Sequence, residues 1–238
     1  MLVLLDSYRQ VLQQLGQALW GLLYPPFCLH CGERVENARF PLCPACQQQL
    51  HRVPKSEALH RLHQLPAAVG CFRAAHALWY YAPKQPLERL HHALKYGNRP
   101  TYGLHLGQIM GKTFSPLLQE TIDVILPIPL HRGRYLARGY NQSAWLAYGV
   151  GDVLGRPVMP KLLQRLRATR SQTHLSRSER QANVAGAFRA PMPDLLRGRH
   201  ILLVDDLLTT GATATAAAHA LHAARVASVT LLTLGLAH

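Results

Sequence analysis

Acidic residues are scarce in this 238-residue chain, which has 12 Asp and Glu against 26 Lys and Arg and a formal net charge of +14. Lysine is scarce too, since five of the 26 cations are Lys and the rest are Arg. Guanidinium groups bind phosphate oxygens in pairs, so this balance favours phosphate contact over simple solubility. Anionic partners are therefore expected: a pyrophosphate-bearing substrate, a nucleic acid, or both. A generally basic surface is the alternative that charge leaves open.

Several other features are missing. No apolar run reaches the length of about 18 residues that a membrane span needs. Residues 1–6 lack the basic region and the small-residue cleavage site of a secretory signal, so we expect a cytoplasmic protein. Although the chain has 14 His, it contains no His-x3-His or His-Glu-x2-His pattern, which argues against a catalytic metal site.

The N-terminal half contains two motifs. Residues 4–23 carry Leu and Val at roughly helical spacing and predict an amphipathic helix, which packs against the next module or, alternatively, lies on a membrane surface. Two knuckles follow in the pattern Cys28-x2-Cys31-x11-Cys43-x2-Cys46. Four thiolates in two pairs predict a structural Zn²⁺ site, because paired cysteines in the cytosol are more often metal ligands than disulfides. Redox chemistry and chance clustering are the alternatives.

The rest of the chain is organised around the stretch from Arg199 to Thr213. It starts as a continuous apolar run, as in a strand buried on both faces, and continues through Asp205 and Asp206 to a Thr-Thr-Gly turn and an Ala-rich helix. The turn and the helix N-terminus form a cradle for a phosphate, to which Thr hydroxyls add donors. Carboxylates would repel a phosphate but suit sugar hydroxyls or a divalent cation. The pattern predicts a ribose 5-phosphate site; a buried strand ending in a polar turn is the alternative.

Two further segments carry basic side chains. Residues 122–129 predict a second buried strand, which is followed by a Pro-fixed loop with Arg132, Arg134 and Arg138. Because ligands of parallel α/β sheets bind at the carboxyl ends of strands, this loop is the candidate pyrophosphate site. A helix that simply faces solvent is the alternative. The stretch from Arg165 to Arg180 is rich in Arg, Ser, Thr and Gln, and it is either a mobile lid over a polyanion or an ordinary surface loop.

These motifs, in this order, resemble the ComF family, in which a small zinc-binding segment precedes a domain like the type I phosphoribosyltransferases. The resemblance rests on the Cys pairs, Leu94-Lys95-Tyr96, Pro127-Ile128-Pro129-Leu130, Arg138-Gly139-Tyr140-Asn141-Gln142, the segment 165–180 and the stretch 204–213. It implies an α/β fold with a parallel sheet flanked by helices, preceded by a small zinc-ribbon-like segment. The parts would be an N-terminal amphipathic helix (1–23), the zinc-binding segment with its four cysteines (24–50), a connector (51–70) and the phosphoribosyltransferase-like domain (71–238).

The resemblance also implies a ligand, phosphoribosyl pyrophosphate (PRPP), bound together with Mg²⁺. Asp205 and Asp206 would hold the ribose hydroxyls, and Leu208, Thr209, Thr210, Gly211, Ala212 and Thr213 would hold the 5-phosphate. Arg132 and Arg138 would meet the pyrophosphate, and Arg167 and Gln172 match the family's mobile loop.

Two functions remain open at this point. The resemblance implies a role in natural competence, in which the protein handles single-stranded DNA in the cytosol, with partners in the DNA-uptake machinery. The alternative is an active phosphoribosyltransferase that transfers ribose 5-phosphate to a nitrogen acceptor. Nothing in the sequence marks a nucleobase pocket, so the acceptor is not identified.

Overall fold

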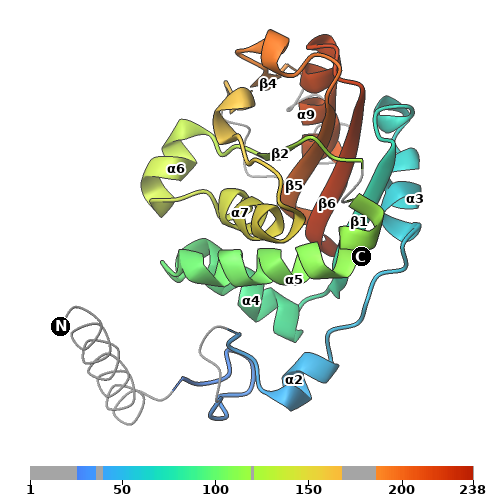
Figure 1. The fold of residues 1–238 in the computed structure, drawn as a ribbon. Coiled ribbons are helices and arrows are strands. Elements are labelled where there is room, and N and C mark those ends of the chain that lie inside the picture. Colours follow the sequence, from blue (N-terminus) through green and yellow to red (C-terminus); the bar gives the residue numbers. More distant parts are fainter. Residues whose placement is uncertain (1–25, 36–39, 119–120, 168–185, 238) are drawn as a thin grey trace, which may run out of the picture.

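A parallel four-stranded sheet forms the centre of the molecule (Figure 1). The computed structural model describes residues 26–35, 40–118, 121–167 and 186–237. The strands are β1 (Ala74–Tyr81), β2 (Val124–Pro127), β5 (His200–Leu208) and β6 (Ser228–Ala237), in the order β1-β6-β5-β2. All neighbouring pairs are parallel. The predicted α/β fold with a parallel sheet is confirmed.

Helices cover both faces of this sheet. Side chains alternate along β5, so Leu202 and Val204 join a core with α4 (Pro86–Tyr96), α5 (Pro100–Leu118) and α7 (Gln142–Leu154). Ile201 and Leu203 face the other core, which includes α3 (Glu57–His63) and α9 (Ala212–Ala223). β5 is therefore buried on both faces, as its apolar run predicts.

Helices α5 and α7 approach each other so closely that glycine is required at the contact. A Cβ atom added at Gly107 would lie 2.1 Å from the carbonyl oxygen of Leu146, and one added at Gly149 would lie 2.0 Å from that of Leu104. Both neighbours are backbone atoms, which cannot move independently of their helix. This contact fixes the position of α7, whose first residues form part of the site described below.

The segment 51–70 contributes to the core as well as connecting two parts of the chain. Within it, α3 and the 3₁₀ turn η1 (Pro66–Ala68) bury Ala58, Leu62 and Leu65 against the sheet. Arg52 forms an isolated antiparallel β-bridge with Trp79 of the edge strand β1. The segment expected as a connector thus also packs against one face of the sheet and contributes to the hydrophobic core there.

Shorter elements complete the described chain. The two-residue strand β3 (Gln164–Arg165) follows the 3₁₀ turn η2 (Pro160–Leu162) and pairs antiparallel with β4 (Phe188–Arg189). The 3₁₀ turn η4 (Pro193–Leu195) precedes β5. Helix α6 (Arg132–Arg138) follows β2, and α2 (Pro44–Gln48) belongs to the cysteine segment, at the bottom of Figure 1.

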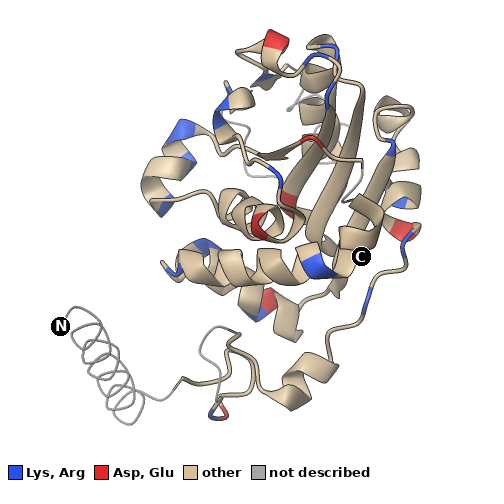
Figure 2. Ribbon diagram, viewed as in Figure 1, with Lys and Arg blue, Asp and Glu red and all other residues tan. Residues whose placement is uncertain are grey.

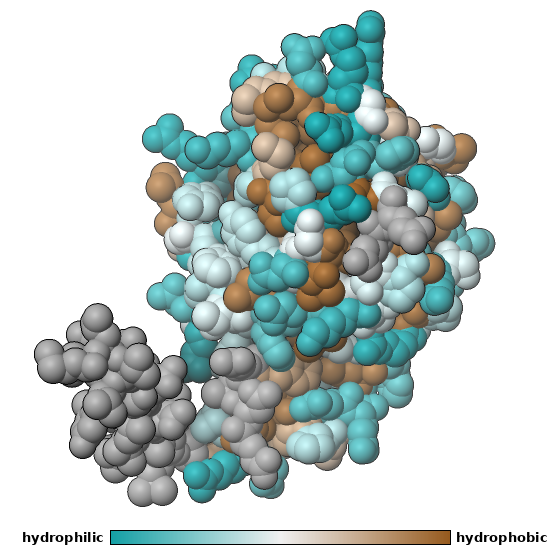
Figure 3. All heavy atoms as spheres, viewed as in Figure 1, coloured by the Kyte–Doolittle hydropathy of each residue, from teal (hydrophilic) through white to brown (hydrophobic). Residues whose placement is uncertain are grey.

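On the face drawn in Figure 3, hydrophobic residues lie between more numerous hydrophilic ones. Among the helices in the described ranges, none has the length and apolar character needed to cross a membrane. The expected amphipathic helix over 1–23 lies outside the described residues.

Candidate functional site: a pocket at the strand ends and a cysteine cluster

A cavity of about 480 Å³ lies where β2 and β5 end. This is the edge of a parallel sheet at which ligands of α/β proteins bind, and the volume suits a small molecule. Its lining combines cationic side chains (Lys95, Arg134, Arg138, Arg165), the two adjacent acids (Asp205, Asp206) and the loop after β5 (Leu208, Thr209, Gly211, Thr213). Positive, negative and hydroxyl groups therefore face one space.

The loop after β5 has the geometry of a phosphate cradle. It leads from Leu208 through Thr209 and Thr210 to Gly211, which caps α9 with a φ angle of +82°. That angle favours glycine, and a Cβ atom at this position would lie 2.6 Å from Cδ2 of Leu62. Leu62 of α3 thus packs beneath the turn. The N-terminus of the 12-residue helix α9 directs its first N–H groups and the positive end of its dipole towards the loop.

Asp206 is buried in a network of donors. Its Oδ2 atom accepts hydrogen bonds from Nε2 of His91 at 3.1 Å and from Nε2 of Gln142 at 3.1 Å, and it lies 3.2 Å from Nζ of Lys95. Burial would raise the pKa of Asp206, but the Lys95 charge and the His91 hydrogen bond hold it well below its usual range. Asp206 is therefore an ionised carboxylate throughout the neutral pH range.

Asp205 has a different environment. Its Oδ1 atom accepts hydrogen bonds from the Ser143 hydroxyl at 2.8 Å and from the Asp206 amide at 2.9 Å. Burial and repulsion by Asp206 raise the pKa of the Asp205 carboxyl to about 7. Two adjacent carboxyl groups with such different pKa values are a common feature of binding and catalytic sites.

Cationic side chains reach the pocket from the other wall. Asn141 caps α7 by accepting a hydrogen bond from the Ser143 amide, and this turn brings Gln142 and Ser143 to the acids. Arg138, at the end of α6, donates to Oε1 of Gln142, and its guanidinium lies 5.4 Å from the centre of the Tyr96 ring. The ribbon of α6 carries several of the blue segments that mark Lys and Arg in Figure 2.

The structure brings together many of the predicted ligand residues. Seven of them line the cavity: Arg138, Asp205, Asp206, Leu208, Thr209, Gly211 and Thr213. Arg132 lies on α6 and is not part of the cavity lining. The lining also does not include Thr210, Ala212 or the exposed Arg167. Gln172 lies outside the described residues.

Sequence reasoning missed other members of the pocket. His91, Gln142 and Ser143 contact the two acids and were not among the predicted site residues. Lys95 entered the prediction only through the family motif Leu94-Lys95-Tyr96, and its ammonium lies in the pocket wall against Asp206. The one available signal was the close succession of polar residues at the start of α7.

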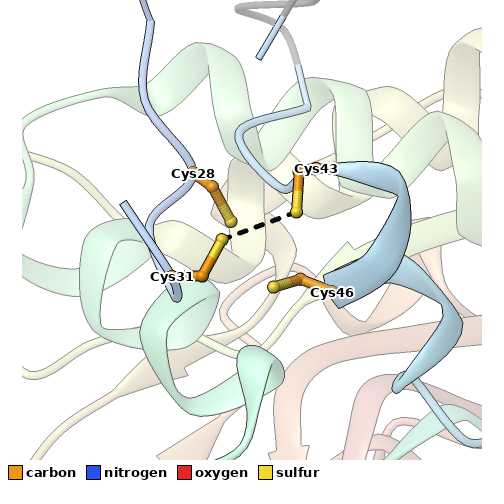
Figure 4. Close-up of side chains that lie close together, drawn as sticks. All are labelled: Cys28, Cys31, Cys43 and Cys46. Atoms are coloured by element: carbon orange, nitrogen blue, oxygen red, sulfur yellow. Dashed lines mark hydrogen bonds between the residues drawn. The ribbon is translucent and has the colours of Figure 1, made fainter. Parts of the chain in front are cut away.

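The four predicted cysteines form a second site, remote from this pocket in sequence. Their Sγ atoms all lie within 4.8 Å of one another, and those of Cys31 and Cys43 are 3.5 Å apart (Figure 4). Tetrahedral Zn²⁺ with Zn–S bonds of about 2.3 Å places its sulfur atoms about 3.8 Å apart, so the cluster could hold a metal ion such as zinc. All five cysteines, including the buried Cys71, are free thiols.

Local electrostatics fit a cation in this cluster. Burial would raise the pKa of the Cys28 thiol, but backbone hydrogen bonds from Cys31, Cys43 and His30 lower it to about 6. Burial and the neighbouring thiols raise the pKa of Cys46. Four thiolates this close repel one another, and a bound divalent cation removes that repulsion because it deprotonates and neutralises its ligands.

One known protein family matches the part of the chain that contains most of the pocket. The sequence model of a family described as phosphoribosyl transferase domain matches residues 96–235. This range contains the ends of β2 and β5, the loop before α9 and the whole of α6 and α7. It begins directly after Lys95 and leaves out His91 and the cysteine cluster.

Two relatives cover most of the chain. The protein named DNA utilization protein YhgH of Salmonella typhimurium is 32% identical over 205 residues, which are 82% of this chain and 81% of that protein. Competence protein F of Haemophilus influenzae is 26% identical over 215 residues, 78% of this chain and 86% of that protein. A solved structure, glutamine PRPP amidotransferase from B. subtilis complexed with ADP and GMP, is 19% identical with a TM-score of 0.41, and the match covers 60% of this chain and 30% of that one.

Proposed function

This chain belongs to the phosphoribosyltransferase family, as its ComF-like motifs predicted, and we propose that its pocket binds PRPP or another ribose 5-phosphate in the service of DNA uptake or utilization in the cytosol. The observation that carries the proposal is the convergence of a phosphate-cradling loop, two carboxylates and several Arg side chains on one cavity. These groups complement, in turn, the 5-phosphate, the ribose hydroxyls and the pyrophosphate.

Calorimetric titration with PRPP and Mg²⁺ tests the proposal. We expect saturable binding to one site. Thr213→Val removes a hydroxyl donor from the cavity and should weaken binding about tenfold, the effect of one hydrogen bond to a charged group. The exposed Thr101 provides a matched control, because Thr101→Val changes the same atoms away from the pocket. Absence of binding to the unmodified protein at millimolar PRPP would refute the proposal.

The two metal ions have different places in this proposal. Zn²⁺ would be held by Cys28, Cys31, Cys43 and Cys46, where it would stabilise the short N-terminal segment. Mg²⁺ would arrive with the pyrophosphate of PRPP, and Asp205 is the partly exposed carboxylate in the cavity wall that suits it or its bound water. Magnesium neutralises phosphate charge when bound; the protein's own Arg side chains orient the same group.

Single-stranded DNA is the macromolecular partner that we propose. Tyr96 and Tyr135 are 66% and 50% exposed. Tyr135 belongs to α6, as do Arg132, Arg134 and Arg138, and the Arg138 guanidinium lies 5.4 Å from the centre of the Tyr96 ring. Exposed aromatic rings stack on unpaired bases, while guanidinium groups contact the phosphates. Protein partners in the DNA-uptake machinery would then meet the DNA on this protein.

Fluorescence anisotropy with a labelled oligo-dT strand at several salt concentrations tests this part. Affinity should fall steeply with salt, and Arg132→Gln should reduce the log–log slope by about 0.7, as expected for one lost phosphate contact. Arg73→Gln changes an exposed Arg just before β1, at the opposite end of the sheet, and should leave the slope unchanged. A salt-independent affinity, or an equal effect of both variants, would contradict the DNA surface.

Catalysis is a second candidate function. Arg134, Arg138 and Arg165 line the cavity that contains Asp205, so cations stand where pyrophosphate would depart. A nitrogen lone pair would attack C1 of the ribose, the bond from C1 to the pyrophosphate oxygen would break with its electron pair, and the acceptor nitrogen would release its proton to water. Pyrophosphate release from PRPP and Mg²⁺ in the presence of nitrogen bases measures this activity. No release with any base would leave binding as the function.

A further inference from the structure

A second cavity, of about 410 Å³, lies between the cysteine segment, the edge strand β1 and helix α5. Its volume is within the range of small-ligand pockets, and it shares no lining residue with the pocket at the strand ends. Five of its seven lining residues have planar side chains: Phe40, Gln47, Arg52, Trp79 and His105. The function proposed above uses none of these three rings, the guanidinium group or the amide.

The three rings of this cavity form one packed group. The centre of the Phe40 ring lies 6.4 Å from that of Trp79 and 6.2 Å from that of His105. Phe40 and Trp79 are 9% and 4% exposed and belong to the hydrophobic core, whereas His105 is only half-buried in the cavity wall. The two buried rings therefore support His105, which is the ring that a ligand can reach.

Arg52 provides a second flat group in the cavity. Its guanidinium lies over the Trp79 ring, 5.4 Å from the ring centre, and the Tyr80 amide donates to the His51 carbonyl oxygen at 2.9 Å, which holds this segment against β1. Nη1 of Arg52 donates to the Thr113 hydroxyl at 3.3 Å, and within the described ranges no carboxylate forms an ion pair with Arg52. Because the side chain is exposed, most of its five N–H groups can donate to a ligand.

Gln47 provides an acceptor beside these donors. Its Nε2 atom donates to the Leu42 carbonyl oxygen at 2.7 Å, which orients the amide group. No contact between described residues engages its Oε1 atom, so this oxygen can accept a hydrogen bond from a ligand. The cavity thus combines flat walls with N–H donors and a carbonyl acceptor.

We infer that this second cavity binds a nucleobase, which belongs either to a free nucleotide or to a single-stranded nucleic acid. Bases stack on imidazole rings and on guanidinium planes, and their edges carry neighbouring acceptors and donors that match Arg52 and Gln47. A hydrocarbon ring has the same flat face but would leave both polar groups without partners. Guanine is the best match, because its O6 and N7 atoms accept two N–H groups of one guanidinium. This site is additional to the pocket at the strand ends and does not depend on PRPP binding there.

Calorimetric titration with deoxyguanosine tests the inference, because this probe carries a base but no phosphate. We expect saturable binding at millimolar concentration, and much weaker binding of benzyl alcohol, whose ring has no hydrogen-bonding edge. Arg52→Gln should weaken deoxyguanosine about tenfold, the effect of a hydrogen bond to a charged group. His105→Ala should weaken it about tenfold through lost stacking. Arg73→Gln and His60→Ala change exposed residues outside both cavities and should leave the affinity unchanged.

The source of the base is identified by comparing deoxyguanosine monophosphate with a single-stranded trinucleotide that contains one guanine. Only the part of the binding that Arg52→Gln weakens is attributed to this cavity. Equal affinities in that part indicate a free nucleotide as the ligand, and tighter binding of the trinucleotide indicates a strand.

Failure of this proposal and failure of the proposed function give different results. Thr213→Val should weaken PRPP and leave the deoxyguanosine affinity unchanged, and Arg52→Gln should do the reverse. The nucleobase site is overturned if deoxyguanosine does not bind, if benzyl alcohol binds as tightly, or if Arg73→Gln weakens deoxyguanosine as much as Arg52→Gln does. Should Arg52→Gln fail to fold, His105→Ala decides alone: an unchanged affinity overturns the inference, and a tenfold loss supports it.

Discussion

The ammonium group of Lys95, near the end of α4, lies 3.2 Å from Oδ2 of Asp206 in β5. Their side chains are 24% and 9% exposed, so the ion pair is largely removed from water. His91, one helical turn before Lys95, contacts the same oxygen. Helix α4 and the central strand are thus joined by charge at the edge of the proposed ligand pocket.

Lys95→Met should destabilise the protein by about 3 kcal/mol, because it leaves the Asp206 carboxylate buried without its ammonium partner. Urea unfolding measures the change. Lys112→Met, at an exposed position of α5, is the matched control and should have little effect. Equal unfolding free energies for the two variants would show that Lys95 does not stabilise the buried charge.

The acids should give the stability a characteristic pH dependence. The pKa of Asp205 is raised to about 7 in the folded protein, above the ordinary carboxyl value of 3.8, so ionisation of this group opposes folding as the pH rises from about 4 to 7. Asp205→Asn removes this penalty. Relative to the unmodified protein, the variant should therefore be more stable at pH 8 than at pH 5, by about 1.4 kcal/mol for each pKa unit. Urea unfolding at both pH values measures the difference, and a pH-independent difference would contradict the raised pKa.

Asp206 should change the folding stability with pH in the opposite direction. Because its pKa is lowered by folding, its stabilising effect is present above the ordinary carboxyl value near 4 and is lost as the pH falls below it. Asp206→Asn should consequently destabilise the protein at pH 7 more than at pH 3. Unfolding by urea at the two pH values checks this, and a larger destabilisation at pH 3 would reverse the assigned direction.

Gly149→Ala should destabilise the protein by about 3 kcal/mol, the upper range for overpacking, because the new methyl group would collide with the Leu104 carbonyl oxygen. Gly133→Ala is the control: its Cβ atom would meet only ordinary contacts with His131 on the exposed helix α6. Thermal unfolding of both variants measures the effect. A Gly149→Ala protein as stable as the control would show that α5 and α7 can separate without cost.

Cys43→Ser should abolish stoichiometric zinc binding, because three thiolates remain of a four-ligand site. Metal analysis of the purified protein gives the stoichiometry, and hydrogen exchange should show loss of protection confined mainly to residues 26–50. Cys71→Ala changes the one cysteine outside the cluster and should retain the metal. One zinc per chain in the Cys43→Ser protein would rule out the four-thiolate site.

Much of the architecture could be predicted because it depends on short-range patterns. The apolar run 201–204 predicted a strand buried on both faces, and the Cys-x2-Cys pairs predicted a cluster of thiols; both are confirmed. The Thr-Thr-Gly turn predicted a loop before a helix, and Gly211 has the positive φ angle that such a turn needs.

The sequence by itself determined the parallel sheet, the cysteine cluster and the family, because local spacing and side-chain chemistry suffice to define strands, knuckles and a phosphate loop. Only the tertiary structure decided which contacts each of the two adjacent acids makes. Asp205 and Asp206 are identical in type and adjacent in sequence, and they differ because α4 brings His91 and Lys95 to one of them and α7 brings Ser143 to the other. That difference arises from helix packing between distant segments, including the close glycine contact of α5 and α7, and no local pattern encodes it.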